Sequence, residues 1–280
     1  MNWRRPAGLS TLTALLIIIV IVVAVAMVVR SSHRHAIVGA GARDTSSAGG
    51  TVGSPTTRAL PPSAIAPAPG GGLPVVARKP APVSPGFEGC PAVGDHGDAA
   101  LNRLKNRVDS AVWIPVAFDS VLALPWPSAV ERRARDRWSR GATSQVKKWE
   151  GLPLSIEGYF VGGKLEGPES PNCHGADAPM RDWHLWLAAQ PGRDRRQAIV
   201  VETTPVIRAT HPAWSLTTVH RLVRDSTPVR VSGWLMLDPE HPEQVGKTRG
   251  TIWEIHPILR IEARVRGRWV PLDSLRQRGR

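Results

Sequence analysis

The sequence is poor in cysteine and lacks the C-x-x-C and H-x-x-x-H spacings of common zinc sites. Its two cysteines, Cys90 and Cys173, are too far apart for a C-x-x-C motif, which argues against a cysteine zinc site. No two histidines stand in an H-x-x-x-H arrangement. Gly246-Lys247-Thr248 resembles the end of a phosphate-binding loop, but His241 stands where that loop requires a glycine. The chain therefore carries none of these motifs, and it has no internal repeat.

Acidic residues are also scarce. The chain has 36 lysines and arginines against 23 aspartates and glutamates, a formal net charge of +13. Such a balance favours an anionic partner, which can be membrane headgroups, nucleic acid or another acidic polymer. The alternative is a solvated basic surface without a partner. The basic run from Arg132 to Lys148 and the basic tail at 276–280 allow both interpretations.

One long hydrophobic run stands out near the N-terminus. From Leu9 to Val29 the chain has no charged residue, and at about 1.5 Å per residue this run spans the roughly 30 Å hydrocarbon core of a bilayer. The sequence therefore predicts a short tail at 1–8 and a single transmembrane helix at 9–29. Arginines flank the run on both sides, so flanking charge does not set its orientation. A cleaved secretory signal is the alternative, because Ala24-Val25-Ala26 offers a cleavage site.

Residues 30–86 are rich in proline, glycine, alanine and serine and show no apolar periodicity. Such a segment cannot bury enough apolar surface to offset its ordering entropy, so it is predicted to be a disordered linker. It would hold the domain on average about 40 Å from the membrane. The Pro/Gly/Ala-rich composition and the high arginine content are typical of high-GC bacterial genomes. We expect a protein of the bacterial inner membrane whose globular domain is extracytoplasmic.

The rest of the chain is predicted to be mainly β. A helical extension at 87–150 should contain one helix at 98–108, capped by Asp98, and a second from Ser128 to Trp138. Strands are expected at 153–161, 182–189, 198–204, 229–237 and 251–263, with a helix at 212–223. This β-β-β-α-β-β order predicts a five-stranded OB-fold-like barrel at 151–275. Gly158 lies at a predicted bend in the first strand.

The alternation of residues along the strands predicts which face of the barrel each side chain occupies. The inward positions are apolar or small: Trp183, Leu185, Leu187, Ile199, Val201, Thr203, Val231, Gly233, Leu235, Trp253 and Ile255. The outward positions mix aromatic and titratable groups: Asp182, His184, Trp186, Glu202, Arg230, Trp234, Glu254 and His256. OB barrels bind ligands on the outer face of strands two and three, between the loops predicted here at 163–181 and 238–250. The candidate ligand-binding residues are Asn172, His174, Asp182, His184, Trp186, Arg230, Trp234, His241, Glu254 and His256.

Several of these residues have two interpretations. A divalent metal is a possible cofactor, with His174, His184, His241 and His256 as candidate ligands, or these groups are merely solvated loop residues. Trp186 and Trp234, with Arg230, form a stacking platform for bases or sugars, or they pack under the helical extension. Cys90 and Cys173 form a disulfide in an oxidising compartment, or Cys173 is a nucleophile beside His174 or His184.

Four segments resemble a family of bacterial exported or membrane-anchored proteins of unknown function: Pro171-Asn172-Cys173-His174, the run 182–187 (DWHLWL), the run 229–236 (VRVSGWLM) and the run 253–258 (WEIHPI). The resemblance covers roughly 90–273 and implies no activity. At fold level the barrel also resembles secreted thermonucleases, OB proteins that hydrolyse nucleic acids with calcium. Their Asp/Arg/Glu constellation is not recognisable in this chain, so that likeness transfers no function.

Two functions fit these patterns. The first is a membrane-tethered OB-fold-like binding module for an oligosaccharide, a nucleic acid strand or a protein partner, since no catalytic motif is present. The second is a metal-dependent hydrolase of the phosphodiesterase or nuclease type, which would use the cluster of histidines and carboxylates.

Overall fold

The structure is a computed structural model that describes residues 73–74, 79–192 and 194–275. The predicted tail at 1–8, the transmembrane helix at 9–29, most of the linker and the basic tail at 276–280 lie outside the described residues. Within the described ranges, no helix combines the length and the apolar character needed to cross a bilayer.

Five strands close into a barrel, as expected from the sequence. They are β2 (Pro153–Leu165), β3 (Trp183–Ala188), β4 (Ile199–Thr203), β5 (Pro228–Leu237) and β6 (Trp253–Val265). β2 pairs antiparallel with β3, β3 with β4 and β5 with β6, whereas β4 and β6 are parallel. A further antiparallel pairing between β2 and β5 closes the barrel. The prediction of a mainly β protein built on a five-stranded barrel is confirmed.

The long strand β2 pairs with two different strands of the barrel along its length. It pairs with β5 from Pro153 to Tyr159 and with β3 from Tyr159 to Leu165. Gly158 lies at the point of exchange, where the backbone of β3 approaches so closely that a Cβ would meet the Ala188 carbonyl oxygen. Only glycine leaves the space that this approach requires.

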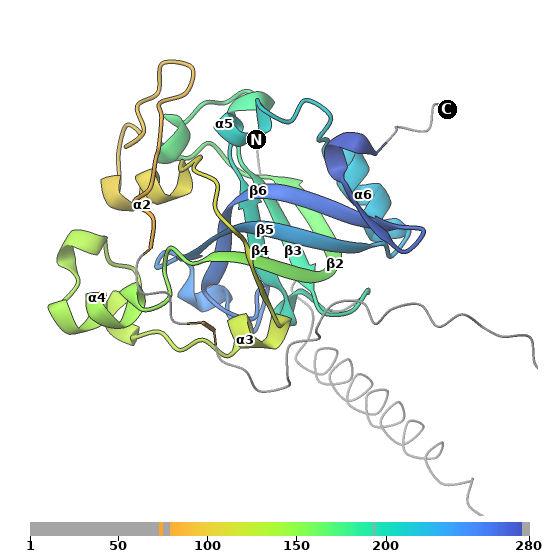
Figure 1. Cartoon of the computed structure of the whole chain (residues 1–280). Coiled ribbons are helices and arrows are strands. Elements are labelled where there is room, and N and C mark those ends of the chain that lie inside the picture. Colours follow the sequence, from red (N-terminus) through yellow and green to blue (C-terminus); the bar gives the residue numbers. More distant parts are fainter. Residues whose placement is uncertain (1–72, 75–78, 193, 276–280) are drawn as a thin grey trace, which may run out of the picture. The chain divides into compact units, whose positions relative to one another are not determined.

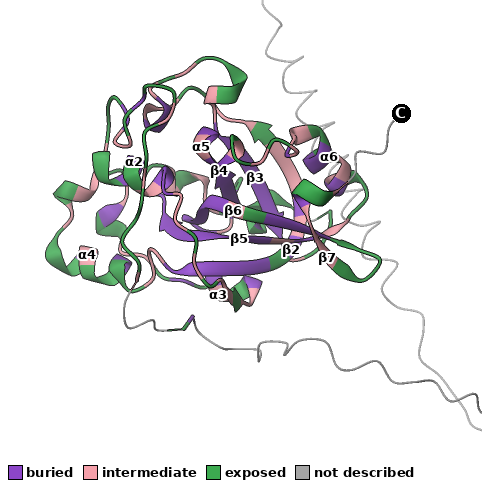
Figure 2. Ribbon diagram, turned by 45° about the horizontal axis from the view of Figure 1, so that its top comes forward, coloured by how far each residue is buried: buried purple, intermediate pink, exposed green. Residues whose placement is uncertain are grey.

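The barrel interior is the main hydrophobic core. The inward positions predicted from strand alternation, such as Leu185, Val201 and Ile255, are fully buried and belong to one cluster. Two helices, α5 (Pro205–Arg208) and α6 (Leu216–Arg224), lie between β4 and β5. The Ser215 hydroxyl caps α6 by accepting from the Thr218 N–H, and the helix buries Val219 and Leu222. Figure 2 shows the buried strands at the centre, with the exposed faces of the helices around them.

The N-terminal extension contains three α-helices and one strand. These are α2 (Ala99–Lys105), β1 (Ile114–Val116), α3 (Phe118–Leu122) and α4 (Arg140–Lys147), and β1 adds a parallel strand to β2. The Asp98 side chain caps α2 as predicted, since it accepts from the N–H groups of Ala100 and Leu101. In Figure 1, α2 and α4 lie on one side of the barrel and α6 lies on the other.

The predicted second helix from Ser128 to Trp138 is wrong. Two short 3₁₀ turns occupy this segment, and α4 begins only after it. Arg132 interrupts the helical backbone because its φ is 54° and its N–H donates to the Pro239 carbonyl. The Arg135 N–H donates to the Asp98 carboxylate instead of continuing a helix. Contacts to the rest of the domain therefore override the local helical pattern.

Two further segments differ from expectation. A seventh strand, β7 (Arg268–Pro271), pairs with the end of β6 through a turn at Arg266 and Gly267, both with positive φ. The last part of the predicted linker also packs on the domain, because Lys79 Nζ donates to carbonyl oxygens at the end of α4 and its neighbour Glu150. The remaining short elements are 3₁₀ turns at Ser128–Val130, Arg135–Arg137, Ser170–Asn172, Ala178–Met180, Arg195–Gln197, Pro242–Gln244 and Leu272–Ser274.

Candidate binding site

A pocket of about 450 Å³ opens on the outer face of β3, β4 and β6. Its walls come from these strands, from α2 and from the loops around 164–169, 195 and 238–249. The lining is almost entirely charged or polar: Lys105, Lys164, Glu166, Glu169, His184, Trp186, Arg195, Glu202, Asp238, His241, Glu243, Gln244, Lys247, Thr248, Arg249 and Glu254. This is the face and the pair of loops predicted to bind a ligand.

His184 and Glu202 form a close pair in this pocket. They are direct partners in the β3–β4 register, and His184 Nδ1 lies 2.5 Å from Glu202 Oε1. Both side chains are buried. Burial raises the pKa of Glu202, but the hydrogen bond from His184 and the positive charge of the nearby histidines outweigh it and lower this pKa to about 2. Glu202 is therefore a stable anion.

His256 lies behind this pair, with a side chain that is 0% exposed. Three carboxylates surround its ring: Glu202 at 3.3 Å and Glu254 at 3.6 Å from Nδ1, and Asp182 at 3.5 Å from Nε2. Burial lowers the pKa of His256, but these carboxylates outweigh it and raise this pKa to about 10. The site thus favours a cation at this position.

Arg249 is the buried cation on the opposite side of Glu254. Its Nη1 lies 2.7 Å from Glu254 Oε1 and 2.8 Å from Asp238 Oδ2, and Asp238 also pairs with His241 Nδ1 at 2.8 Å. Burial raises the pKa of Asp238, but His241 and Arg249 lower it well below its usual range. The hydrogen bond to Asp238 in turn raises the pKa of His241 to about 8.

Lys105 brings the N-terminal extension into the pocket. It lies at the end of α2, its side chain is buried, and its Nζ is 3.0 Å from Glu169 Oε2. Burial lowers the pKa of Lys105, but Glu169 and more distant carboxylates raise it well above the usual value. Sequence reasoning missed this residue. Its signal is the four-residue spacing from Leu101, which places both side chains on one helix face.

Two cations at the pocket mouth stand apart from these pairs. Arg195 lies over Trp186, with Cζ 3.9 Å from the ring centroid, and the Trp186 Nε1–H donates to the Thr248 carbonyl. Lys247 lies next to Thr248 in the same loop, and both Arg195 and Lys247 are exposed. Among the described residues, neither cation has a carboxylate within ion-pair distance, whereas every other cation that lines the pocket has one. The unpaired charge of the pocket is therefore positive.

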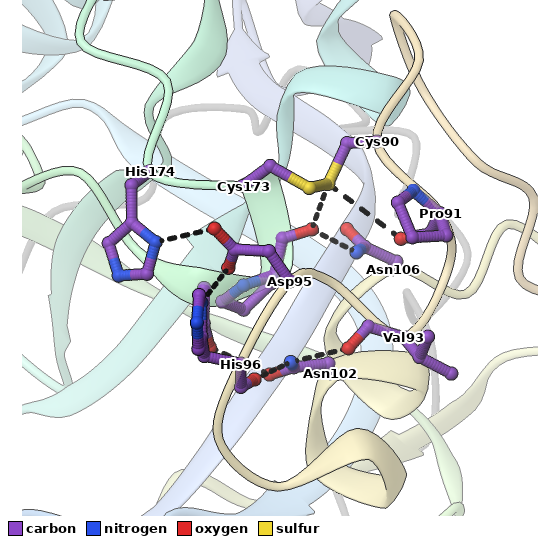
Figure 3. Close-up of a disulfide and its surroundings, with 11 residues drawn as sticks. Cys90, Pro91, Val93, Asp95, His96, Asn102, Asn106, Cys173 and His174 are labelled. Carbon is purple, nitrogen blue, oxygen red and sulfur yellow. Dashed lines mark hydrogen bonds and ion pairs between the residues drawn. A yellow bond between two sulfur atoms is a disulfide. The ribbon is translucent and has the colours of Figure 1, made fainter.

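The four candidate histidine ligands do not come together. His184 and His256 share Glu202 and His241 lines the same pocket, but His174 pairs with Asp95 at 2.9 Å. Figure 3 shows the rings of His174 and His96 both directed at the Asp95 carboxylate. The four candidate histidines therefore do not share one site, and metal binding by His184, His241 or His256 stays a prediction. Asn172, another candidate, donates to Asp182 Oδ1 at 2.7 Å and is buried beneath the pocket.

The predicted stacking platform does not form either. Trp234 packs under the extension, with the Arg107 guanidinium 3.4 Å from its ring centroid and its Nε1–H donating to the Asp109 carbonyl. Arg230 pairs with Glu262 at 2.7 Å, near Trp269, and neither Trp234 nor Arg230 lines the pocket. For Trp234 the alternative interpretation holds, since it supports the extension.

The predicted disulfide between Cys90 and Cys173 is confirmed (Figure 3). It joins the start of the extension to the loop between β2 and β3. Asn106 strengthens this junction, since its Nδ2 donates to the Pro171 carbonyl at 2.8 Å. Cys173 therefore has no free thiol, and its interpretation as a nucleophile is wrong.

No protein-family model, curated protein or solved structure matches this chain. The resemblance to exported bacterial proteins of unknown function stays a prediction.

Proposed function

We propose that this chain is a membrane-tethered OB-fold binding module whose pocket takes an anionic group of an extracytoplasmic ligand. The observation that carries this proposal is the unpaired positive charge of Arg195 and Lys247 at the mouth of the pocket. The other pocket cations are already neutralised by neighbouring carboxylates. An anionic ligand would therefore form ion pairs with Arg195 and Lys247 without breaking a buried ion pair.

The order of the barrel strands supports the OB assignment. The closed path β2-β3-β4-β6-β5, with the helical segment between β4 and β5, corresponds to strands one, two, three, five and four of an OB barrel. The pocket then lies on the face where OB barrels bind oligonucleotides and oligosaccharides. Fold alone fixes no ligand, so the choice of an anion rests on the pocket charges.

Sequence features support the location. The uncharged run from Leu9 to Val29 has the length and character of a membrane anchor, and a Pro/Gly/Ala-rich segment follows it as a tether. The Cys90–Cys173 disulfide suits an oxidising compartment outside the cytoplasm.

Fluorescence anisotropy of the full chain in mild detergent tests the proposal. The probes are a labelled single-stranded DNA oligonucleotide and labelled heparin as anions, with labelled dextran as a neutral polymer. We expect an anionic probe to bind, with an affinity that falls steeply as salt rises. Lys247→Gln and Arg195→Gln should each weaken this binding several-fold.

Lys148→Gln is the matched control, because Lys148 is an exposed lysine that does not line the pocket. It removes the same charge from the chain. If it weakened binding as much as Lys247→Gln, the attraction would come from net charge and the pocket proposal would fail. Binding to dextran alone, or binding independent of salt, would equally contradict an anionic ligand.

A further inference from the structure

Three buried polar atoms beneath the pocket floor have no hydrogen bond. Among the described residues, neither ring nitrogen of His256 has a hydrogen-bond partner, and neither does Asp182 Oδ2. Both side chains are 0% exposed. A buried polar atom without a partner is destabilising, so three adjacent ones call for an explanation.

We propose that Asp182, Glu202 and His256 bind a divalent transition-metal ion such as Zn²⁺ or Mn²⁺. One ligand atom from each of these three side chains lies within 4.8 Å of the other two. The ligands come from the start of β3, from β4 and from β6, so the closed barrel itself positions them. The site needs no movement of a loop to bring its ligands together.

The distances suit an ion better than direct hydrogen bonds. His256 Nε2 lies 3.5 Å from Asp182 Oδ2, which is longer than a good N–H···O bond. Two ligands bound at about 2.1 Å to a tetrahedral ion lie roughly 3.4 Å apart. The observed separation matches that of two ligands on one metal ion.

The groups around the three ligands resemble the outer shell of a metal site. Nδ1 of His256 faces Glu202 at 3.3 Å and Glu254 at 3.6 Å, and a carboxylate beside the second ring nitrogen orients a ligating imidazole. The second oxygen of Asp182 accepts from Asn172 at 2.7 Å. The second oxygen of Glu202 pairs with His184 at 2.5 Å. Each ligand is thus held by a further polar contact.

The donor set indicates the class of metal. One imidazole and two carboxylates suit zinc, manganese or iron, whereas magnesium and calcium prefer oxygen ligands alone. The two cysteines are joined in a disulfide and supply no thiolate. Glu202 and Glu254 also line the pocket, so an ion can reach the site from there and would add positive charge below the ligand.

The test is metal analysis of the full chain, purified in mild detergent without chelators. Mass spectrometry of the elements should find close to one equivalent of transition metal per chain. After EDTA treatment and removal of the chelator, added Zn²⁺ or Mn²⁺ should raise the unfolding temperature. Asp182→Asn and Glu202→Gln, which keep side-chain size, should each weaken metal binding by about tenfold or more.

His174→Gln is the matched control, because His174 belongs to a separate, exposed group with Asp95 and His96. This variant should leave the affinity for the metal ion unchanged. The proposal is overturned if the folded wild-type chain contains no metal and gains no stability from either ion. It is also overturned if His174→Gln abolishes binding while Glu202→Gln retains it. The metal content of the wild-type chain tests the proposal even where a variant fails to fold. Because this measurement uses no anionic probe, its outcome is independent of the binding test of the pocket.

Discussion

The guanidinium of Arg107 lies over the indole of Trp234, with Cζ 3.4 Å from the ring centroid. The same guanidinium donates two hydrogen bonds to the Asp109 carboxylate, from Nε at 3.0 Å and from Nη2 at 2.7 Å. Arg107 is only 1% exposed. The cation–π contact therefore joins the N-terminal extension to β5 of the barrel, and the ion pair with Asp109, which also lies in the extension, holds the guanidinium in place.

Arg107→Ala should lower the free energy of unfolding by about 3 kcal/mol, because it leaves Asp109 without its partner and uncovers Trp234. Arg107→Lys should recover only part of this loss, since an ammonium group cannot make the forked contact. Denaturant unfolding followed by tryptophan fluorescence measures both. Arg103→Ala, at an exposed position of α2, should change stability by no more than about 0.5 kcal/mol. Equal effects at both positions would contradict the assigned role.

The barrel was predictable because strand alternation is a local property. The inward positions Leu185, Val201 and Ile255 follow from period two alone, and all are buried as expected. The Ser128–Trp138 segment was not predictable in this way. Its conformation depends on hydrogen bonds to Asp98 and Pro239, which are distant in the chain.

The candidate site was predictable to a similar extent. The outer-face residues His184, Glu202 and Glu254 meet at the pocket because they share a face of adjacent strands. Strand alternation does not identify Lys105 and Arg195, since each reaches the pocket from a segment outside the barrel strands. For Trp234, alternation predicts an outward side chain, but the sequence leaves open whether this side chain forms a stacking surface or packs under the extension.

Removal of the disulfide should destabilise the domain. The bond closes a loop with a sequence separation of 83, for which the chain-entropy relation gives about 4.5 kcal/mol. The double variant Cys90→Ser/Cys173→Ser should lose about 2–5 kcal/mol of unfolding free energy in urea. A reductant should destabilise the wild-type chain and leave the double variant unchanged. If reduction affected both alike, its effect would not come from this bond.

The His241–Asp238 pair should make stability depend on pH. The pKa of His241 is about 8 in the folded chain and about 6.5 when unfolded, so its stabilisation is complete below pH 6.5 and is lost as pH rises through 8. Solvent screening limits the effect to about 1 kcal/mol, because the His241 side chain is 43% exposed. Unfolding measurements from pH 6 to 9 should show a shallower decline for His241→Gln than for the wild type. An identical pH dependence in both would contradict the pairing.

Gly158, where β2 changes its pairing partner from β5 to β3, should tolerate no side chain. A methyl group at Gly158 would lie 2.6 Å from the Ala188 carbonyl oxygen and 3.1 Å from the Leu187 side chain. Gly158→Ala must therefore push β2 and β3 apart, and we expect a loss of about 2–3 kcal/mol in unfolding free energy. Gly167→Ala is the control, since nothing lies within 4 Å of its added Cβ, and it should change stability by at most about 0.5 kcal/mol. A neutral Gly158→Ala would contradict the close approach of β2 and β3 at this residue.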